Sequence, residues 1–371
     1  MPGGPGTQAS IRAEPGIATF WALVSITFIG PFSIHMFFPA LPHIRAAFAT
    51  DAAMAQLTFS IAMLSMSAAT LFYGTLSDRL GRLPVVIAGL SLFSAGAALA
   101  GLAQSIEVLI AARALQGVGA ACGMVMARAI ARDLYGAHRL GQMIAYITAA
   151  YVVAPMIAPL VGGVLADGFG WQSILIVPAA FGIFAIFATV PVIGETKPKD
   201  LRPEQSVLRG VALLLTKKRF ILFALNPAFG TAGFFSLNSG AVYLMAETMQ
   251  RPASEFGLYF ILGSIGYLTG NYLSGFLSRW LSGQFLIVAG SCVTLCGGLV
   301  LVGSILWIGL HPLCLFIPSA ILSFGQGFSM PHAQAQAIRL EPALTGTASG
   351  LVVFLQLFIG AIATQIAGAL T

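Results

Sequence analysis

Long apolar stretches separated by short polar loops run through the whole chain. Membrane-barrel strands would be short and would alternate apolar and polar residues, and these stretches do neither. A helix satisfies its own backbone hydrogen bonds in lipid and needs about 20 apolar residues to cross a bilayer. The pattern predicts an all-α membrane protein with eleven transmembrane helices at 17–39, 54–76, 84–104, 108–130, 140–165, 172–193, 220–246, 256–277, 284–306, 313–334 and 346–370.

The longest polar segment, residues 194–218, separates six predicted helices from five. The loop GTLSDRLGR, which begins at Gly74, returns in altered form as GFLSRWLSG from Gly275. A loop repeated at half-chain spacing is typical of two pseudo-symmetric helical bundles with a site between them. The predicted organisation is a loose N-terminal segment, a six-helix bundle, a cytoplasmic linker and a five-helix bundle, at 1–16, 17–193, 194–218 and 219–371.

The repeat also predicts a twelfth helix after 346–370, and the sequence ends at Thr371 without one. We therefore expect the second bundle to be incomplete, with lowered stability and with the C-terminus on the outer side. Insertion of the chain into the membrane is still expected.

Composition supports a membrane environment, because the chain is 58% hydrophobic and only 8% charged, with a mean hydropathy of +0.91. A soluble domain is about one quarter charged. Fifteen of the eighteen Lys and Arg residues fall in loops on one side of the predicted membrane, and only Arg45 and Arg251 lie in loops on the other. The positive-inside rule places the N-terminus in the cytoplasm. The net charge of +6 is therefore a topology signal, and no nucleic-acid partner is expected.

Other chemistries are excluded by what the sequence lacks. The phosphate-binding pattern GxxxxGK[ST] does not occur, which argues against an ATP-driven pump. No paired carboxylates or nucleophile cluster occur in any loop, so we expect no enzyme and no cofactor. The cysteines lie in apolar segments without CxxC spacing, which predicts neither a metal site nor a disulfide, at Cys122, Cys292, Cys296 and Cys314.

Three motifs in order give the chain a family resemblance. The loop 74–82 is similar to the signature between helices 2 and 3 of the major facilitator superfamily. Residues 113–135, which begin RALQGVG, resemble the helix 4 signature of proton-coupled members, and 154–163, APMIAPLVGG, resembles the antiporter signature of drug exporters. With FPALP at 38–42, the chain looks most like the bicyclomycin-resistance (Bcr/CflA) group, and the resemblance covers essentially its whole length.

The resemblance implies a monomeric, multi-pass exporter in the bacterial inner (plasma) membrane. It would move small lipophilic or amphipathic compounds by alternating access, in exchange for protons. One position departs from the group, because His35 stands where an aspartate is usual in helix 1. No Asp or Glu lies near the middle of any predicted span. An uncoupled facilitator or metabolite exporter therefore remains an alternative, and a non-transporting membrane scaffold is a third.

Seven residues are candidates for coupling or for the substrate cavity. A guanidinium inside a span, as at Arg113, is costly and faces either a functional cavity or a structural partner. The imidazole of His35 could carry a proton or could only bond a neighbouring helix. The resemblance implies that helices 1, 4, 7 and 10 line the centre, which adds Gln116, Asn226, Asn238, Gln326 and His332 to His35 and Arg113.

Two gates are also predicted. Asp78 is expected to pair across the cytoplasmic face or, as the resemblance implies, to face the positive start of the last helix near Gly346. The predicted cytoplasmic gate comprises Gly74, Asp78, Arg79, Gly81, Arg82, Arg128, Arg132 and Asp133.

The outer gate is expected in helix 5, where prolines permit a bend and glycines permit close packing. A second set of glycines lies in helix 8, and we predict that the two small faces seal the outer side. The residues are Pro155, Pro159, Gly162 and Gly163 in helix 5, and Gly263, Gly266 and Gly270 in helix 8.

Overall fold

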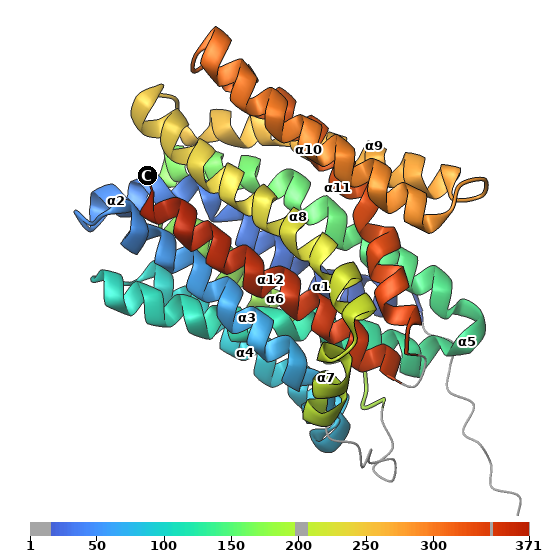
Figure 1. The fold of residues 1–371 in the computed structure, drawn as a ribbon. Helices are drawn as coiled ribbons and strands as arrows, with labels where there is room; N and C mark the ends of the chain where they lie inside the picture. Colours follow the sequence, from blue (N-terminus) through green and yellow to red (C-terminus); the bar gives the residue numbers. More distant parts are fainter. Residues whose placement is uncertain (1–15, 197–206, 342–343, 371) are drawn as a thin grey trace, which may run out of the picture.

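A computed structural model describes residues 16–196, 207–341 and 344–370, and within them all regular structure is helical (Figure 1). The loose segment predicted at 1–16 lies, except for Gly16, outside the described residues. The elements are α1 Ile17–Met36, a 3-10 turn Phe38–Ala40, α2 Leu41–Ala47, α3 Ala52–Leu80, α4 Arg82–Gly101, α5 Ile106–Phe169, α6 Ser173–Thr189, α7 Val207–Leu215, α8 Lys218–Tyr243, a π-helical turn Leu244–Thr248, α9 Ala253–Leu277, α10 Gly283–Ile308, α11 Pro312–Arg339 and α12 Thr345–Ala369.

Each predicted span coincides with helical structure. By length and composition, nine helices in the described part of the chain can cross a membrane, so the count of eleven is not confirmed. The helix α6 has only 17 residues, and α9 is not among the nine. The protein is nevertheless an all-α, multi-pass membrane protein, as the sequence predicts.

The fourth and fifth predicted spans lie within the single element α5. A straight helix of 64 residues would be about 96 Å long, three times the thickness of a bilayer core. Both ends of α5 lie at the same end of the molecule, because Gly101, just before it, contacts Gln172 and Ile176, just after it. The chain therefore turns back within α5 and crosses the membrane twice, as Ile106–Tyr135 and Tyr146–Phe169.

Polar caps encoded in the sequence set several helix starts. Asp51 accepts a hydrogen bond from the Met54 N–H at 2.7 Å at the start of α3. Ser282 accepts one from the Phe285 N–H at 3.2 Å at the start of α10. Each cap satisfies a backbone donor that the first helical turn leaves free.

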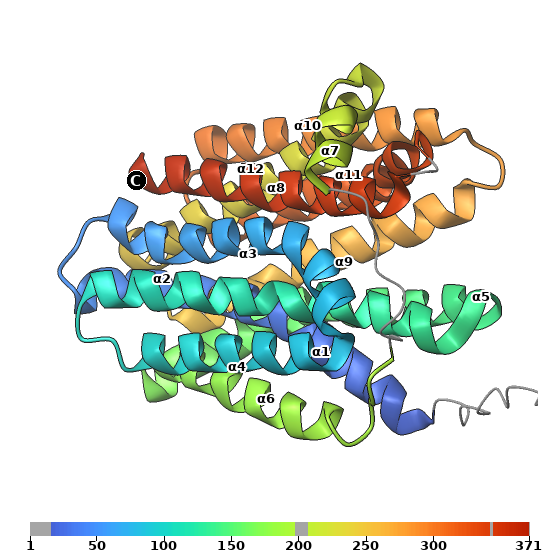
Figure 2. The ribbon, with the colours of Figure 1, turned by 90° about the horizontal axis from the view of Figure 1, so that it is seen from below.

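The helices pack in two groups (Figure 2). The elements α1, α3, α4, α5 and α6 form the N-terminal group, and α8 to α12 form the C-terminal group. Two pairs, α3 with α12 and α5 with α9, make the main contacts between the groups. We call the end that carries Arg82, Lys217 and Arg339 the basic end, and the end that carries Arg45 and Arg251 the opposite end.

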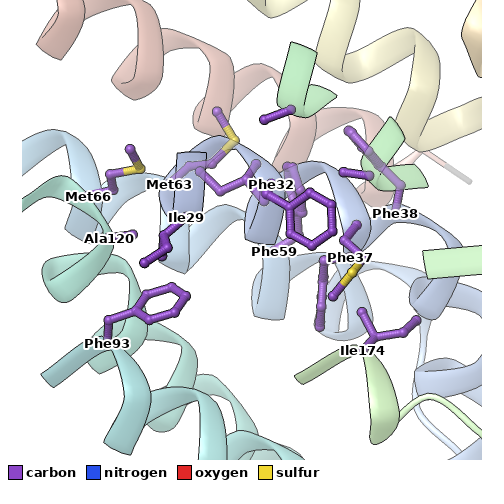
Figure 3. Close-up of a cluster of buried hydrophobic side chains, with 14 of the residues drawn as sticks. Ile29, Phe32, Phe37, Phe38, Phe59, Met63, Met66, Phe93, Ala120 and Ile174 are labelled. Atoms are coloured by element: carbon purple, nitrogen blue, oxygen red, sulfur yellow. The ribbon is translucent and has the colours of Figure 1, made fainter. Parts of the chain in front are cut away.

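Aromatic and sulfur-containing side chains fill the interior of the N-terminal group (Figure 3). Phe38, Phe59 and Phe235 form a triangle of mutually contacting rings, with centroids 4.7, 5.9 and 5.8 Å apart. Close backbone approach comes from small residues: an added Cβ on Gly123 would collide with the Ile26 carbonyl oxygen. Because lipid offers no hydrophobic drive between helices, such close packing is a main source of association.

The predicted linker contains one further helix, α7, which is not among the helices expected from the sequence. Gly210 of α7 lies against Thr347 and Leu344 at the start of α12. Leu214 is fully buried in a cluster with Phe220 and apolar residues of α12. The nine residues Val207–Leu215 are too few to span a membrane, so a search for long apolar stretches does not detect this helix.

Candidate functional site

A cavity of about 410 Å³ lies between the two helix groups. His35 and Phe235 line its inner end, and Arg128 and Ile338 line it toward the basic end. Most of the remaining wall consists of Phe, Met, Pro, Val, Leu and Ile side chains from both groups. A mostly apolar pocket of this size with a few polar groups is typical of a binding site for a small organic compound.

His35 stands at the closed end of this cavity. Its Nδ1 lies 2.8 Å from the Pro31 carbonyl oxygen, which can only accept, so Nδ1 carries the proton. The ring is surrounded by aromatic neighbours, with centroids 5.4 to 6.3 Å away, at Phe38, Phe234, Phe235 and Phe260. In the neutral ring, Nε2 is then the one free acceptor, held within a cage of aromatic side chains.

The C-terminal wall of the cavity carries the side-chain amides of Asn271 and of three glutamines. Gln326 donates to the Gly230 carbonyl oxygen at 2.8 Å, Gln334 donates to Gln356 at 3.1 Å, and Gln356 donates to Thr231 at 3.3 Å. The sequence predicts Gln326 as a cavity residue, but not Asn271, Gln334 or Gln356. The spacing of eight residues between Gln326 and Gln334 places both on one helix face and could have identified Gln334.

Arg113 is 1% exposed inside the N-terminal group and is not among the residues that line the cavity. It donates to the Thr58 carbonyl oxygen at 3.1 Å and to Gln116 at 2.5 Å, and its guanidinium lies 4.0 Å above the Phe37 ring centroid. Gln116 in turn donates to Ser33 at 2.9 Å. These contacts link α1, α3 and α5 within the N-terminal group.

The other three predicted cavity residues make hydrogen bonds within the C-terminal group. Asn226 donates to Ser291 at 2.9 Å, and Asn238 donates to the Phe234 carbonyl oxygen at 2.7 Å. His332 Nε2 lies 2.7 Å from the Ser274 hydroxyl. Of the seven candidates, His35 and Gln326 line the cavity, and Arg113, Gln116, Asn226, Asn238 and His332 do not.

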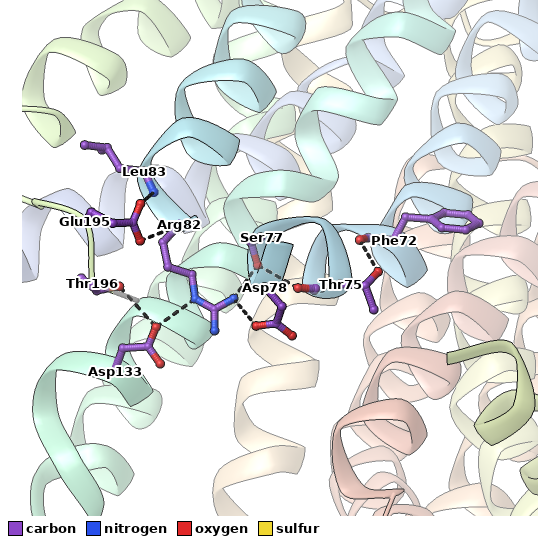
Figure 4. Close-up of polar contacts among 10 residues, drawn as sticks. Phe72, Thr75, Ser77, Asp78, Arg82, Leu83, Asp133, Glu195 and Thr196 are labelled. Atoms are coloured by element: carbon purple, nitrogen blue, oxygen red, sulfur yellow. Dashed lines mark hydrogen bonds and ion pairs between the residues drawn. The ribbon is translucent and has the colours of Figure 1, made fainter. Parts of the chain in front are cut away.

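At the basic end, Arg82 is the centre of a polar network (Figure 4). Its buried guanidinium lies 2.9 Å from Asp133 and 3.0 Å from Asp78. Glu195 accepts hydrogen bonds from the backbone N–H groups of Arg82 and Leu83 at 2.9 and 3.1 Å. The sequence gives no signal for Glu195 in this network, because Glu195 lies in the linker 113 residues after Arg82.

Gly81 makes this network possible. Its φ of +99° suits glycine, and an added Cβ would lie 2.5 Å from the Glu195 carboxylate. Among the other predicted residues of the cytoplasmic gate, Arg128 lines the cavity, and Arg79 and Arg132 are exposed. Added Cβ atoms on Gly74 and on Gly346 would meet open space.

At the opposite end, α5 and α9 are in backbone contact. An added Cβ would collide with the Met36 carbonyl oxygen at Gly162, with the Ala253 carbonyl oxygen at Gly163, and with the α5 backbone at Gly257. The same part of α5 contains Pro155 and Pro159, and Pro155 lines the cavity.

The eighth predicted span corresponds to α9 in the structure. The glycine face predicted to pack against α5 is wrong at two positions. Gly266 and Gly270 pack against the backbone of Ala320 and Phe324 in α11, and Gly263 lines the cavity. Gly257 contacts α5 in their place. It lies six residues before Gly263, a rotation of about 240° around the helix, so it belongs to a different face.

A second seam closes the same end between α3 and α12. Ser60 donates to Gln365 at 2.5 Å, and Gln365 donates to the Ala53 carbonyl oxygen at 2.9 Å. Gln56 is fully buried beside Gly368 and accepts a hydrogen bond from Ser239 of α8 at 2.5 Å. The cavity is therefore closed toward the opposite end on two sides.

Two helix groups around a cavity that is closed at one end form the arrangement of a secondary transporter. Residues 23–364 match the family described as Major Facilitator Superfamily, and the chain belongs to this family. The protein is thus a membrane transporter rather than an enzyme, as the sequence predicts.

The curated relatives include bacterial resistance proteins. The chain is 28% identical to Multidrug resistance protein D of Escherichia coli K12, over 93% of this chain and 87% of that protein. It is 24% identical to a bicyclomycin resistance protein homolog of Haemophilus influenzae, over 91% of this chain and 85% of that protein. These similarities agree with the group that the sequence motifs indicate.

Solved transporters share the fold. A bacterial homolog of the human lysosomal transporter Spinster, in an inward-facing and unoccupied conformation, aligns with a TM-score of 0.76 at 17% identity, over 94% of this chain and 80% of that one. The xylose transporter XylE from E. coli, in a partially occluded inward open conformation, aligns with a TM-score of 0.72 at 12% identity, over 95% and 91%. At these identities the likeness concerns the fold alone.

Proposed function

We propose that this protein exports small lipophilic or amphipathic compounds across the bacterial inner membrane by alternating access. The observation that carries the proposal is the mostly apolar cavity, which is sealed toward the opposite end and lined by Arg128 and Ile338 toward the basic end. The excess of Lys and Arg at the basic end supports a cytoplasmic location for that end. The resistance names of the relatives support efflux as the direction.

Alternating access requires a second state, in which the cavity closes at the basic end and opens at the opposite end. The contacts of α5 with α9 and of α3 with α12 near the opposite end would separate in that state. At the basic end, Asp78 would approach the start of α12 near Gly346, where the helix dipole favours an anion. A substrate shifts this equilibrium only by the difference in its affinity for the two states.

We assign proton exchange to His35. The imidazole lines the cavity at its closed end, so it would face the opposite compartment once the seams separate. Protonation there and release toward the cytoplasm would couple inward proton flow to outward substrate flow. The second candidate is an uncoupled facilitator or metabolite exporter, and one observation favours it: none of the described residues that line the cavity is an Asp or Glu.

The test is transport of lipophilic dyes and antibiotics in proteoliposomes with an imposed pH gradient. His35→Gln is compared with His43→Gln, because both imidazoles lie close to the carbonyl oxygen of a proline four residues earlier. We expect gradient-driven transport in the wild type and in His43→Gln, and loss of the gradient dependence in His35→Gln. Gradient-independent transport by the wild type would instead establish the uncoupled reading, and no transport of any compound would refute export.

A further inference from the structure

Arg128 differs from the other buried or partly buried arginines of the two helix groups. Arg82 is paired with two carboxylates, and Arg113 donates to an amide and to a carbonyl oxygen. Arg128 is half-buried in the cavity wall, and within the described part of the chain its guanidinium makes neither an ion pair nor a hydrogen bond. A guanidinium carries five N–H donors and is always charged, so this position favours an acceptor from solution.

The rest of the cavity supplies no compensating charge. The described lining residues include no carboxylate, and Arg128 is their one permanently charged member. Neutral polar side chains line the same cavity: the Tyr151 hydroxyl lies within electrostatic range of the guanidinium, and Thr148, Tyr267 and Asn271 are further lining residues. Hydroxyl and amide groups can donate to an anion bound at Arg128, as charge-assisted hydrogen bonds.

The position of Arg128 along the cavity determines how a bound ligand would be oriented. Arg128 follows Arg113 on α5 by 15 residues, or about 22 Å of helix, and so lies toward the basic end. The opposite end of the cavity is formed by Phe234 and Phe235 around His35. Met66 and Met124 line the cavity as well, and flexible thioether side chains adapt to apolar groups of varied shape.

We propose that the cavity binds amphiphiles with an anionic head group, such as a carboxylate or a sulfonate, with the head at Arg128 and the apolar body toward the phenylalanines. Lipophilic cations bind less tightly, because they meet one fixed positive charge and no negative one. The proposal narrows the substrate class of the proposed exporter, although binding itself does not depend on the direction of transport. Repulsion between the guanidinium and a ligand cation about 6 Å away in a partly hydrated cavity weakens binding of the cation about tenfold.

The experiment uses three probes that share one apolar body: 4-(1-pyrenyl)butyrate, the corresponding trimethylammonium compound, and the neutral alcohol. Binding to the full-length protein in phosphatidylcholine nanodiscs is measured by pyrene fluorescence at about pH 7, where the carboxylate is ionised. Empty nanodiscs correct for partition into lipid. We expect the carboxylate to bind at least about tenfold more tightly than the ammonium compound, with the alcohol between them.

Arg128→Gln should reduce the affinity for the carboxylate to that for the alcohol, and Arg128→Lys should retain part of the preference. The matched control is Arg219→Gln, an exposed arginine at the basic end that does not line the cavity. Butyrate, which has the head without the apolar body, should not compete, and this separates an amphiphile site from a site for small anions. Equal binding of the three probes, an equal loss in Arg219→Gln, or no binding would overturn the proposal.

A transport assay distinguishes failure of the anion site from failure of the proposed function. If the carboxylate binds with the expected dependence on Arg128 but no compound is transported in proteoliposomes, export fails and the anion site stands. If neutral and cationic compounds are exported and the carboxylate has no advantage in binding, export stands and the anion site is refuted.

Discussion

Asp167, at the end of α5, accepts a hydrogen bond from the backbone N–H of Ser254, in the first turn of α9, at 2.9 Å. Its other carboxylate oxygen accepts one from the Ala253 N–H at 3.1 Å. The N-cap position of α9 is Pro252, which has no side-chain cap of its own. A carboxylate of the N-terminal group therefore caps a helix of the C-terminal group, and it can do so only while the opposite end is closed.

Asp167→Ala should shift the protein toward the state that is open at the opposite end. Loss of a side-chain cap costs about 1 kcal/mol, or about fivefold in population. The measurement is labelling of Val242→Cys by an impermeant maleimide added at the opposite end, in a chain whose four cysteines are replaced by serine. Val242 is 2% exposed and lies at the base of a depression at that end, so faster labelling reports opening.

The control for this prediction is Asp51→Ala. Asp51 also caps a helix, but it caps its own α3 within the N-terminal group. Loss of this cap should lower stability without faster labelling of Val242→Cys. Equal labelling rates in the two variants would show that the contact of Asp167 with α9 does not hold the two groups together.

Gly163→Ala should slow transport several-fold without reducing insertion. The new Cβ would collide with the Ala253 carbonyl oxygen, and overpacking of this kind costs about 1–3 kcal/mol, here in the closed seam between α5 and α9. The measurement is the transport rate per inserted protein. Gly168→Ala is the control on the same helix, because its Cβ would meet open space. Unimpaired transport in Gly163→Ala would count against a tight seal at this position.

Gln365→Leu should loosen the seam between α3 and α12. It removes a donor and an acceptor that bond Ala53 and Ser60, and each lost hydrogen bond in a closed interface costs about 1 kcal/mol. Spin labels at Thr50 and Thr248, on either side of the opposite end, should show a larger fraction of long distances in pulsed electron resonance. The exposed Gln284→Leu, on α10, should leave the distance distribution as in the wild type.

Arg82→Gln should lower the thermal stability of the purified protein. It leaves Asp78 and Asp133 without their shared cation, and because both carboxylates are about one fifth exposed, the cost is about 2 kcal/mol rather than that of a fully buried pair. The measurement is the apparent Tm in detergent, with Arg219→Gln as the exposed control. An equal apparent Tm for Arg82→Gln and wild type would mean that water replaces the guanidinium at little cost.

The sequence could predict the helices and the family because lipid imposes a simple demand. A spanning segment needs about 20 apolar residues in one run, so the pattern alone identifies every long helix. The loop around Asp78 and the helix containing Arg113 resemble family motifs and lead to the superfamily without tertiary contacts. The same length criterion misses α7 in the linker, because this helix is too short to span a membrane.

The tertiary structure alone decided which polar residues share the cavity and which glycines form the seals. The rotation of each helix about its axis places Gln334 and Gln356 in the cavity wall. It also turns Arg113 toward Thr58 and Phe37, and it brings Gly257 rather than Gly266 against α5. In a span that is apolar on all sides, the sequence carries little information about this rotation. It is set by close packing between residues that are far apart in the chain, as between Asp167 and Ser254.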